Sequence, residues 1–371
     1  MPRPALRLGP LPPIQVSPGT LITVLLLAAM IFPSMALPGA SLALAASLAV
    51  GVALVLILSV LLHEAAHAVA AHLSGATVDH IALTLWGGHT QYRGAPLGPL
   101  ASIVVSLVGP LSNLLLAGLA HLAARSVESE AALAFWSACS LLNLALAVFN
   151  LLPGLPMDGG RALEALLGGV LRSPVRGTVI TAWIGRGIAV LALGVPLWRI
   201  LEAGGTGTLG LLTLLWALLI AGMLWQGASS ALNGARLQRR IEGLDLAALA
   251  RPIRLVPPTQ PLGALDVDPE DVLVLEPGTA RPGVLGRVRR LDAAALAAVP
   301  AEHRERTPVS AVAAPLGELG VLPATLGGEQ LVSAMMRRPA PAYAVLDAEQ
   351  RMLGVVLAAD VQRRLGASRR P

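Results

Sequence analysis

The sequence contains no lysine and a single cysteine, and both shortages restrict its chemistry. All 27 basic residues are arginines, and they form no patch interleaved with aromatic residues, which argues against a nucleic-acid partner. Cys139 is the only thiol, which excludes an intrachain disulfide and a zinc cluster of several thiolates. Charge is also scarce, because 13% of the residues are charged and 55% are hydrophobic. With a mean hydropathy of +0.70, this composition indicates a membrane protein.

Long apolar runs occupy the first 230 residues, whereas the rest of the sequence has none. A bilayer-spanning helix needs roughly 20 mostly apolar residues. The first run has the length of a signal peptide, but another run follows it at once, so we expect a retained anchor. We predict about six transmembrane helices, the first broken by Pro33, at Thr20–Leu37, Leu42–Leu73, Leu97–Ala120, Ala131–Leu152, Thr178–Trp198 and Leu209–Ala228.

The arginines between these runs predict the orientation in the membrane. Cytoplasmic loops carry an excess of positive residues. With the N-terminus inside, Arg125 and Arg199 lie outside, and the inside segments hold Arg3, Arg7, Arg93, Arg161, Arg172, Arg176, Arg236, Arg239 and Arg240. We therefore expect a multi-pass protein of the cell membrane with both termini in the cytoplasm.

The stretch GATVDHIALTLWGGHTQYRG, between the second and third runs, alternates branched and polar residues around Gly87 and Gly88. This alternation predicts a short β-hairpin or a re-entrant pair of strands. Lipid leaves the polar groups of such a backbone without partners, so it is tolerated at membrane depth only beside protein or water.

After Arg240 the sequence changes to short apolar strands, prolines and helical pieces with a weak internal repeat. LGRVRRLDAAAL from Leu285 aligns with LGVVLAADVQRRL from Leu353, and TQPLGAL from Thr259 matches TLGGEQL from Thr325 more loosely. Both copies predict strand pairs followed by helices, which indicates a tandem α/β module on the cytoplasmic side. We expect an N-terminal cytoplasmic segment (1–19), a membrane domain (20–230), a linker (231–250) and two repeats (251–305 and 306–371).

The pentad HEAAH, residues 63–67, stands at the end of the second apolar run. Residues four apart on a helix share a face, so His63 and His67 present two imidazoles to one metal ion, with Glu64 beside them. This spacing is typical of zinc sites in which the metal lowers the pKa of water and the glutamate takes its proton. Ionisable residues at membrane depth are costly and indicate a function. His72 lies about half a turn away from the pair and is excluded as a ligand.

A third metal ligand is expected from NLLPGLPMDGGRAL, residues 150–163, at the end of the fourth run. Pro153 and Pro156 prevent a regular helix there, and Gly159 and Gly160 allow a close approach of the backbone. Asp158 is the carboxylate in this break, and we expect it to reach a neighbouring helix. The alternative is that Asp158 only caps the helix that follows.

HEAAH, GPLSN (residues 109–113) and NLLPGLPMDGG together resemble the site-two protease family of intramembrane zinc metalloproteases. The resemblance covers roughly residues 8–230, because RLGPLPPIQV resembles the short strand that opens many bacterial members. It implies that His63, His67 and Asp158 bind one Zn²⁺ ion and that Glu64 is the catalytic base. It also implies that Asn150 and Asn113 orient the substrate, and that the hairpin around Trp86 to His89 pairs with an unwound substrate.

The family hydrolyses a peptide bond in or near a transmembrane helix of membrane-tethered regulators such as anti-sigma factors. The resemblance therefore implies a metalloendopeptidase of regulated intramembrane proteolysis, whose partners are the lipid bilayer and a transmembrane protein substrate. Two alternatives stay open, a CBS-regulated transporter and a catalytically silent, nucleotide-sensing scaffold. A transporter predicts broken helices in both halves of the membrane domain, whereas here the polar residues collect around one site.

The C-terminal repeat resembles a pair of CBS domains, which bind adenine nucleotides between the two repeats. Asp292 and Asp360 match the aspartate that contacts ribose, but the Thr or Ser often found before it is missing, and Leu357 stands there in the second copy. The resemblance implies ATP, ADP or AMP as the ligand. The alternative is a degenerate pair that serves only to form a homodimer.

Overall fold

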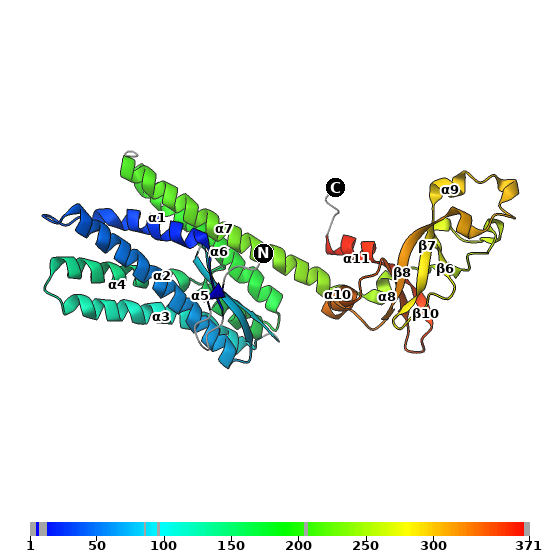
Figure 1. Cartoon of the computed structure of the whole chain (residues 1–371), viewed down its shortest axis with the longest axis horizontal. Helices are drawn as coiled ribbons and strands as arrows, with labels where there is room; N and C mark the ends of the chain where they lie inside the picture. The colour runs from blue at the N-terminus through cyan, green and yellow to red at the C-terminus, as the bar shows by residue number, and fades with distance from the viewer. Residues whose placement is uncertain (1–4, 7–12, 85–86, 95–96, 204–206, 367–371) are drawn as a thin grey trace. The chain divides into compact units, whose positions relative to one another are not determined.

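The computed structural model describes residues 5–6, 13–84, 87–94, 97–203 and 207–366, so the predicted hairpin residue Trp86 lies outside the described residues. The chain divides into two compact units, Met1–Ala235 and Arg236–Pro371 (Figure 1). The first unit is a helical bundle with a small sheet, and the second is built on a larger sheet. The prediction of a helical membrane part followed by an α/β module is confirmed.

Six helices within the described residues are long and apolar enough to cross a membrane. They are α1 (Pro18–Met35), α2 (Leu42–Leu73), α3 (Pro99–Arg125), α4 (Glu130–Asn150), α6 (Pro174–Glu202) and α7 (Thr208–Glu242), and the shorter α5 (Asp158–Val170) lies between α4 and α6. The prediction of a multi-pass membrane protein is therefore confirmed, with helix ends that differ from the predicted ones.

Small residues fill the contacts between these helices, and large apolar residues face outward. On α2, Ala45, Ala49 and Ala53 are buried, whereas Leu54 and Leu58 are exposed. In lipid the hydrophobic effect does not drive helices together, so small side chains that let backbones approach closely are favoured at the contacts. The exposed leucines are what a surface in contact with lipid requires.

The prediction that Pro33 breaks the first transmembrane helix was wrong, because α1 continues through Pro33 to Met35. A proline inside a helix removes one backbone hydrogen bond and crowds the preceding turn. Here Pro33 stands two residues before the end of α1, so most of the helix precedes it and keeps its own bonds. The hydroxyl of Ser34 also donates to the carbonyl of Ile31 at 2.6 Å.

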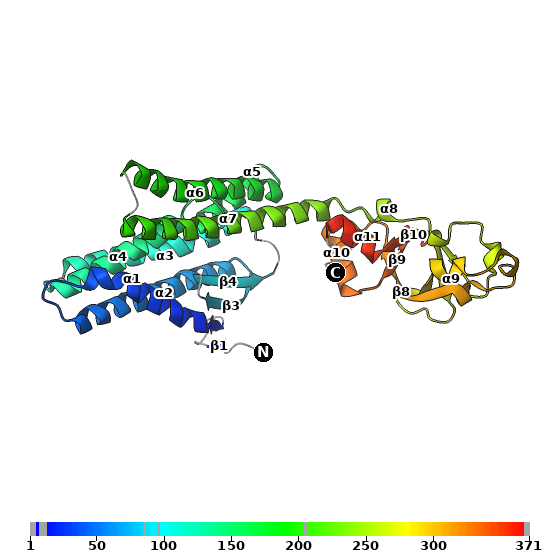
Figure 2. The same cartoon turned by 90° about the horizontal axis from the view of Figure 1, so that it is seen from above.

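A four-stranded sheet covers the C-terminal half of α2 (Figure 2). Its strands are β1 (Ala5–Leu6), β2 (Ile14–Val16), β3 (Thr77–Thr84) and β4 (Gly87–Arg93), in this order across the sheet. β3 and β4 form the predicted antiparallel hairpin, and β2 pairs with β3 in parallel. Ile14 and Ile81 pack on Ala68 of α2. β4 is thus the outer strand of the described sheet.

The loop between α4 and α5 is held by backbone contacts that only glycine permits. A Cβ atom on Gly160 would lie 2.2 Å from the carbonyl carbon of Gly154, and one on Gly185 of α6 would lie 2.0 Å from the carbonyl oxygen of Leu155. Such distances are well inside van der Waals contact, so these positions accept no side chain without a shift of the backbone. The loop is therefore fixed against α5 and α6, and it determines where α5 begins.

Arg186, inside α6, joins α6 to α7. Its guanidinium lies 4.9 Å from the ring centroid of Trp183 and 4.6 Å from that of Trp225, and Nη2 donates to Ser229 at 3.0 Å. Cation–π contacts of this kind offset part of the cost of a charge placed among apolar helices. Arg186 therefore has a structural role between the two helices.

The second unit is built on a six-stranded sheet with the order β10-β9-β8-β7-β6-β5. Its strands are β5 (Arg254–Val256), β6 (Val272–Glu276), β7 (Val284–Leu291), β8 (Ala313–Pro323), β9 (Ala342–Leu346) and β10 (Met352–Leu357). The antiparallel pair β6–β7 is followed by α9 (Ala293–Ala297), and the pair β9–β10 is followed by α11 (Ala358–Leu365). Both copies of the repeat thus contain the predicted strand pair and helix.

The two copies differ in the helix that precedes the strand pair. In the second copy this helix is α10 (Gly328–Arg337), whereas the stretch aligned with it in the first copy forms only a 3₁₀ turn, Leu262–Ala264. The residues after that turn, LDVDPED, favour caps and turns over a helix interior. Within the stretch 231–250, α7 continues to Glu242, and α8 (Leu246–Leu249) follows.

We expect Leu331→Ala to weaken the core of the second unit. Leu331 on α10 is fully buried against Leu246, Tyr343 and Val345, and truncation of such a leucine costs about 2–5 kcal/mol. Hydrogen-exchange mass spectrometry on the full chain should show a loss of amide protection in β9. The matched control is Met336→Ala on the same helix, where the side chain is 78% exposed and protection should not change. Equal protection in both variants would contradict the assignment of this core.

Candidate metal centre

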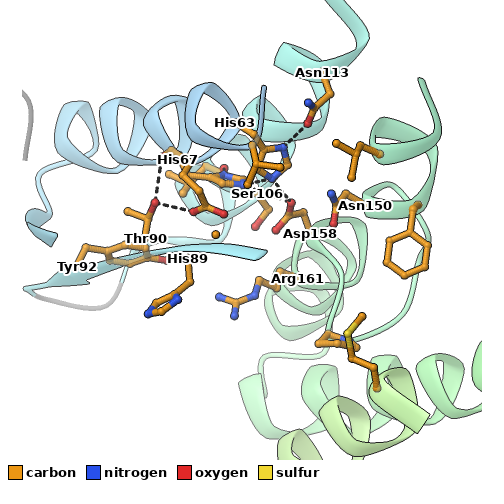
Figure 3. Close-up of a pocket in the computed structure, with 18 residues that line it drawn as sticks. His63, His67, His89, Thr90, Tyr92, Ser106, Asn113, Asn150, Asp158 and Arg161 are labelled. Atoms are coloured by element: carbon orange, nitrogen blue, oxygen red, sulfur yellow. Dashed lines mark hydrogen bonds and ion pairs between the residues drawn. The ribbon is translucent and has the colours of Figure 1, made fainter. Parts of the chain in front are cut away.

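The pentad HEAAH lies in the C-terminal half of α2 and faces the interior of the first unit. His63, Glu64 and His67 are all buried. One helical turn separates the two histidines, so their imidazoles leave the same face of α2. Asp158, the first residue of α5, meets them from the other side, and the ligand atoms of the three residues lie within 4.8 Å of one another (Figure 3).

Three atoms that accept metal ions converge at the centre of this group. Nε2 of His63 lies 3.1 Å from Nε2 of His67. Oδ2 of Asp158 lies 3.1 Å from Nε2 of His63 and 3.3 Å from Nε2 of His67. The carboxylate and the two imidazoles thus form a triangle with nearly equal sides.

Hydrogen bonds on the far side of each imidazole decide which nitrogen carries the proton. Nδ1 of His63 lies 2.6 Å from Oδ1 of Asn113, and Nδ1 of His67 lies 2.5 Å from the carbonyl oxygen of Val105. Both oxygens only accept, so each Nδ1 donates. The neutral imidazoles therefore direct the lone pair of Nε2 into the triangle. Second contacts of this kind orient histidine ligands in metal sites.

The three atoms fit a bound zinc ion. When both imidazoles are neutral, the triangle contains no hydrogen to join two lone pairs and a carboxylate, and these groups repel one another unless a cation lies between them. In tetrahedral coordination with bond lengths of about 2.0–2.1 Å, neighbouring ligand atoms stand about 3.3 Å apart, close to the spacing here. Three protein ligands also leave the fourth position that a catalytic site keeps for water.

Glu64 is held beside the triangle by the hairpin. Oγ1 of Thr90 on β4 lies 2.8 Å from Oε2 of Glu64 and 3.0 Å from the carbonyl oxygen of Glu64. A Cβ atom on Gly88 would lie 2.5 Å from Cγ of Glu64, so only glycine lets β4 come this close. The hairpin thus fixes the carboxylate next to the metal ligands.

Gly109 on α3 leaves space for the imidazoles of His63 and His67. A Cβ atom at this position would lie 2.3 Å from Nε2 of His67 and 2.8 Å from Cε1 of His63. Any larger residue would therefore enter the space of the metal ligands. This contact explains the glycine of GPLSN, whose role the sequence alone did not indicate.

A cavity of about 400 Å³ opens onto the three ligands and Glu64. It is lined on one side by residues of β4, among them His89 and Tyr92, and on the other by Asn150, Asp158 and Arg161 (Figure 3). The hairpin therefore borders a polar cavity, and predicted residues from α2, α4 and α5 meet at it. His72 is exposed at the end of α2 and is not among the lining residues.

Asn113 is engaged by two other side chains in the structure. This residue is 1% exposed, its oxygen accepts from His63, and its Nδ2 donates to Oδ1 of Asn143 at 3.1 Å. Asn143 in turn donates to the carbonyl of Cys139 at 2.9 Å. Both polar atoms of the Asn113 amide are thus engaged, so it positions His63. Asn113 and Asn150, the two predicted substrate contacts, both line the cavity, and their contact with a substrate stays a prediction.

The aspartates predicted to bind nucleotide have different surroundings. Asp360 on α11 is buried, forms ion pairs with Arg251 and Arg363, and lines a cavity of about 400 Å³. Asp292 caps α9, where its Oδ1 accepts from the amides of Ala294 and Ala295, and it is absent from that cavity's lining. The site around Asp360 is therefore rich in arginine, whereas Asp292 has a helix cap as its visible role.

Sequence reasoning missed four side chains or groups that support the site: Asn143, Thr90, Arg161 and the carbonyl of Val105. Asn143 had a signal, because an amide in the middle of an apolar run needs a partner. The other three had none, since their roles depend on how the hairpin, α3 and α5 approach α2 in space.

Comparisons with known proteins agree with the geometry. The family model described as Peptidase family M50 matches residues 117–194, a stretch that contains Asn150 and Asp158. The chain is 31% identical over 196 residues to the putative zinc metalloprotease sll0528 of Synechocystis, which covers 51% of this chain and 49% of that protein. It is 34% identical over 180 residues to the putative zinc metalloprotease Rip3 of Mycobacterium tuberculosis, covering 47% of this chain and 45% of that one.

The chain thus spans about half the length of the curated relatives it matches. Among solved structures, it is similar to the site-2 protease from Methanocaldococcus jannaschii, with 22% identity, a TM-score of 0.42, and coverage of 62% of this chain and 94% of that one. The CBS domain of a bacterial CNNM/CorC family Mg²⁺ transporter covers 41% of this chain and 94% of its own, with 17% identity and a TM-score of 0.25.

The matched family model, the relatives named as zinc metalloproteases and the six apolar helices lead to one assignment. The chain is a multi-pass membrane protein, and its residues 117–194 match Peptidase family M50.

Proposed function

We propose that the chain is a zinc-dependent intramembrane endopeptidase that cuts a peptide bond in or near a transmembrane helix. The observation that supports this most directly is the triangle formed by Nε2 of two buried histidines on α2 and Oδ2 of Asp158 on α5, with Glu64 fixed beside it at a cavity. His63, His67 and Asp158 would hold the ion, and Glu64 would be the catalytic base.

In the proposed reaction one residue of this chain transfers a proton, and others hold that residue and the two imidazoles in place. His63, His67 and Asp158 would hold a Zn²⁺ ion, which would lower the pKa of water and polarise the scissile carbonyl. Glu64 accepts the proton of the attacking water and then delivers it to the leaving amine nitrogen. Thr90 holds Oε2 of Glu64, and Glu64 lines the cavity. Asn113 and Val105 keep both imidazoles turned toward the triangle.

The hairpin offers a place for the substrate. A peptide bond inside a helix is shielded, so a transmembrane substrate has to unwind before it can be cut, and its freed backbone groups need partners. β4 is the outer strand of the described sheet and lines the cavity, so an unwound segment can pair with its free edge. Asn150 on the opposite wall would orient the same segment.

The proposed substrates are single-span regulatory proteins such as anti-sigma factors, cut in regulated intramembrane proteolysis. The proposed orientation has both termini in the cytoplasm. It is supported by a cavity lined by Pro99, Gly169 and Pro174, which brings the start of α3, the end of α5 and the start of α6 to one end of the bundle. Arg93, Arg172 and Arg176 stand in or beside these segments, as the positive-inside rule requires of cytoplasmic loops.

The two alternatives have less support. A transporter fold is expected to break helices in both halves of the membrane domain. Here the described break between α4 and α5 serves a single site. A silent scaffold would not need Thr90, Gly88 and Gly109 to keep Glu64 and the histidines in one fixed arrangement.

We expect Glu64→Gln to abolish cleavage and leave the fold intact. The probe is a fluorogenic span peptide, a synthetic apolar helix with a central Asn-Gly-Pro break between a fluorophore and a quencher, assayed with the full chain in detergent. Loss of a general base costs about 10²–10⁴ in rate, so the variant should be at least about a hundredfold slower than wild type. Cleavage at the wild-type rate by Glu64→Gln, with equal zinc content, would refute the mechanism.

Zinc content tests both the proposed ligands and the space that Gly109 leaves for them. Asp158→Ala removes one of three ligands, and Gly109→Ala places a methyl group 2.3 Å from Nε2 of His67, so both should lower the zinc bound per chain. Gly118→Ala on the same helix is the control, because nothing lies within 4 Å of the added Cβ. The metal is measured by mass spectrometry after dialysis. Full zinc occupancy in Asp158→Ala would exclude this carboxylate as a ligand.

The finer part of the proposal is that adenine nucleotide binds to the CBS-like pair and regulates cleavage. The cavity at Asp360 supports an anionic ligand, since Arg251, Arg363 and Arg364 line it. Calorimetric titration of the full chain with ATP, ADP and AMP should give a binding signal for at least one, weakened by Asp360→Asn and not by Asp266→Asn, an exposed acid paired with Arg254. Silence for all three nucleotides would leave homodimer formation as the proposed role of the pair.

A further inference from the structure

Arg161 extends into the metal-site cavity from α5, one helical turn after Asp158 (Figure 3). Within the described part of the chain, no carboxylate or carbonyl accepts a hydrogen bond from its guanidinium. Glu164, one turn further along α5, is engaged by the hydroxyl of Thr178. Arg161 therefore brings a free set of donors to the same cavity as the metal ligands.

The other arginines of this region differ from Arg161. Arg186 is enclosed by two tryptophans and Ser229, so its charge has partners. Arg176 at the start of α6 is exposed, as Arg161 is, but it lines neither the metal-site cavity nor the adjoining one. Arg161 lines both of these cavities, together with Tyr92 and Ser106. Arg161 therefore lies where a ligand in either cavity can contact it. An arginine that only sets the orientation in the membrane does not need to line a cavity.

The wall opposite Arg161 is formed by β4. A strand that pairs with the free edge of β4 uses half of its backbone groups for that pairing, and the other half point away from β4. In the apolar surroundings of a membrane, each of these outward groups is costly unless it finds a partner. The outward carbonyl oxygens would point toward the wall that carries Asn150, Asp158 and Arg161.

The side chains of that wall supply few donors for such carbonyls. Asp158 only accepts, and Asn150 offers one amide group. Arg161 offers five N–H groups in a planar fork, and a hydrogen bond from a charged donor is stronger than one between neutral groups. A guanidinium is also less strongly hydrated than an ammonium, so it loses less when water leaves the cavity.

We propose that Arg161 is a substrate-binding residue, whose guanidinium donates to backbone carbonyl oxygens of the unwound substrate on the side away from β4. This inference rests on the proposed function, because it needs a peptide segment that lies between β4 and α5. The ligand it recognises is the main chain, so Arg161 contributes to the binding of any unwound segment, whatever its side chains. The two walls of the cavity then hold the two edges of one substrate strand.

Kinetics with the fluorogenic span peptide test this role in the full chain. Arg161→Met keeps most of the length of the side chain and removes its donors, and a lost hydrogen bond to a charged group lowers kcat/KM by about tenfold to a hundredfold, through a higher KM. Arg161→Lys should recover part of the loss, and Arg176→Met is the matched control, expected within about twofold of wild type. Zinc content and melting temperature should equal those of wild type in all three variants.

A second measurement separates this inference from the proposed function. Binding of the uncut peptide is followed by fluorescence anisotropy in the Glu64→Gln background, with and without Arg161→Met, and Kd should rise by the same factor as KM. Equal Kd values in the two variants, or a loss of zinc with Arg161→Met, would overturn the role of Arg161 even if wild type cleaves. A wild-type chain that neither cuts nor binds the peptide would instead refute the proposed function, and this inference with it.

Discussion

The membrane unit depends on one electrostatic constraint: two imidazole nitrogens and a carboxylate oxygen stand 3.1–3.3 Å apart among apolar helices. When both imidazoles are neutral and no cation lies between them, these atoms repel one another, and in a medium of low dielectric the repulsion is large. The protein cannot relieve it by turning the imidazoles, since Asn113 and Val105 hold both Nδ1 atoms. The arrangement therefore favours a bound cation.

Polar groups that cross this bundle form a continuous chain. The amide of Asn143 on α4 accepts from Asn113 on α3, and Asn113 in turn accepts from His63 on α2. Three helices are thus joined by hydrogen bonds in a region where unpaired polar groups cost several kcal/mol. Because alanine fills the surrounding contacts, the backbones lie close enough for these short side chains to meet. The small residues that let these helices pack closely therefore also allow Asn113 to orient His63.

Local sequence patterns predicted the site residues that lie within one helix or within one break between helices. His63 and His67 follow from the period of the helix, and Asp158 follows from a carboxylate set among prolines and glycines at the end of a span. The roles of Asn113, Thr90 and Gly109 did not follow, because each depends on a neighbour that is distant in the sequence. In the fold, the prediction at Pro33 was wrong because a proline near the end of a helix leaves most of the helical hydrogen bonds in place. The short 3₁₀ turn in the first copy of the repeat was hidden by the alignment with α10.

The histidines and the aspartate of the triangle come from two different helices. α2 carries both histidines and Glu64 on one continuous helix, so their mutual geometry is fixed by the helix itself. Asp158 arrives from α5, whose start is set by backbone contacts at Gly154 and Gly160 and whose body packs on α3 and α6. A metal ion held by these three residues would join the two elements, so its binding free energy would also stabilise the docking of α5 against α2. Because Asp158 and Arg161 belong to the same short helix, the metal would also fix the wall that faces β4, and the width of the cavity is then a property of the metal-bound state.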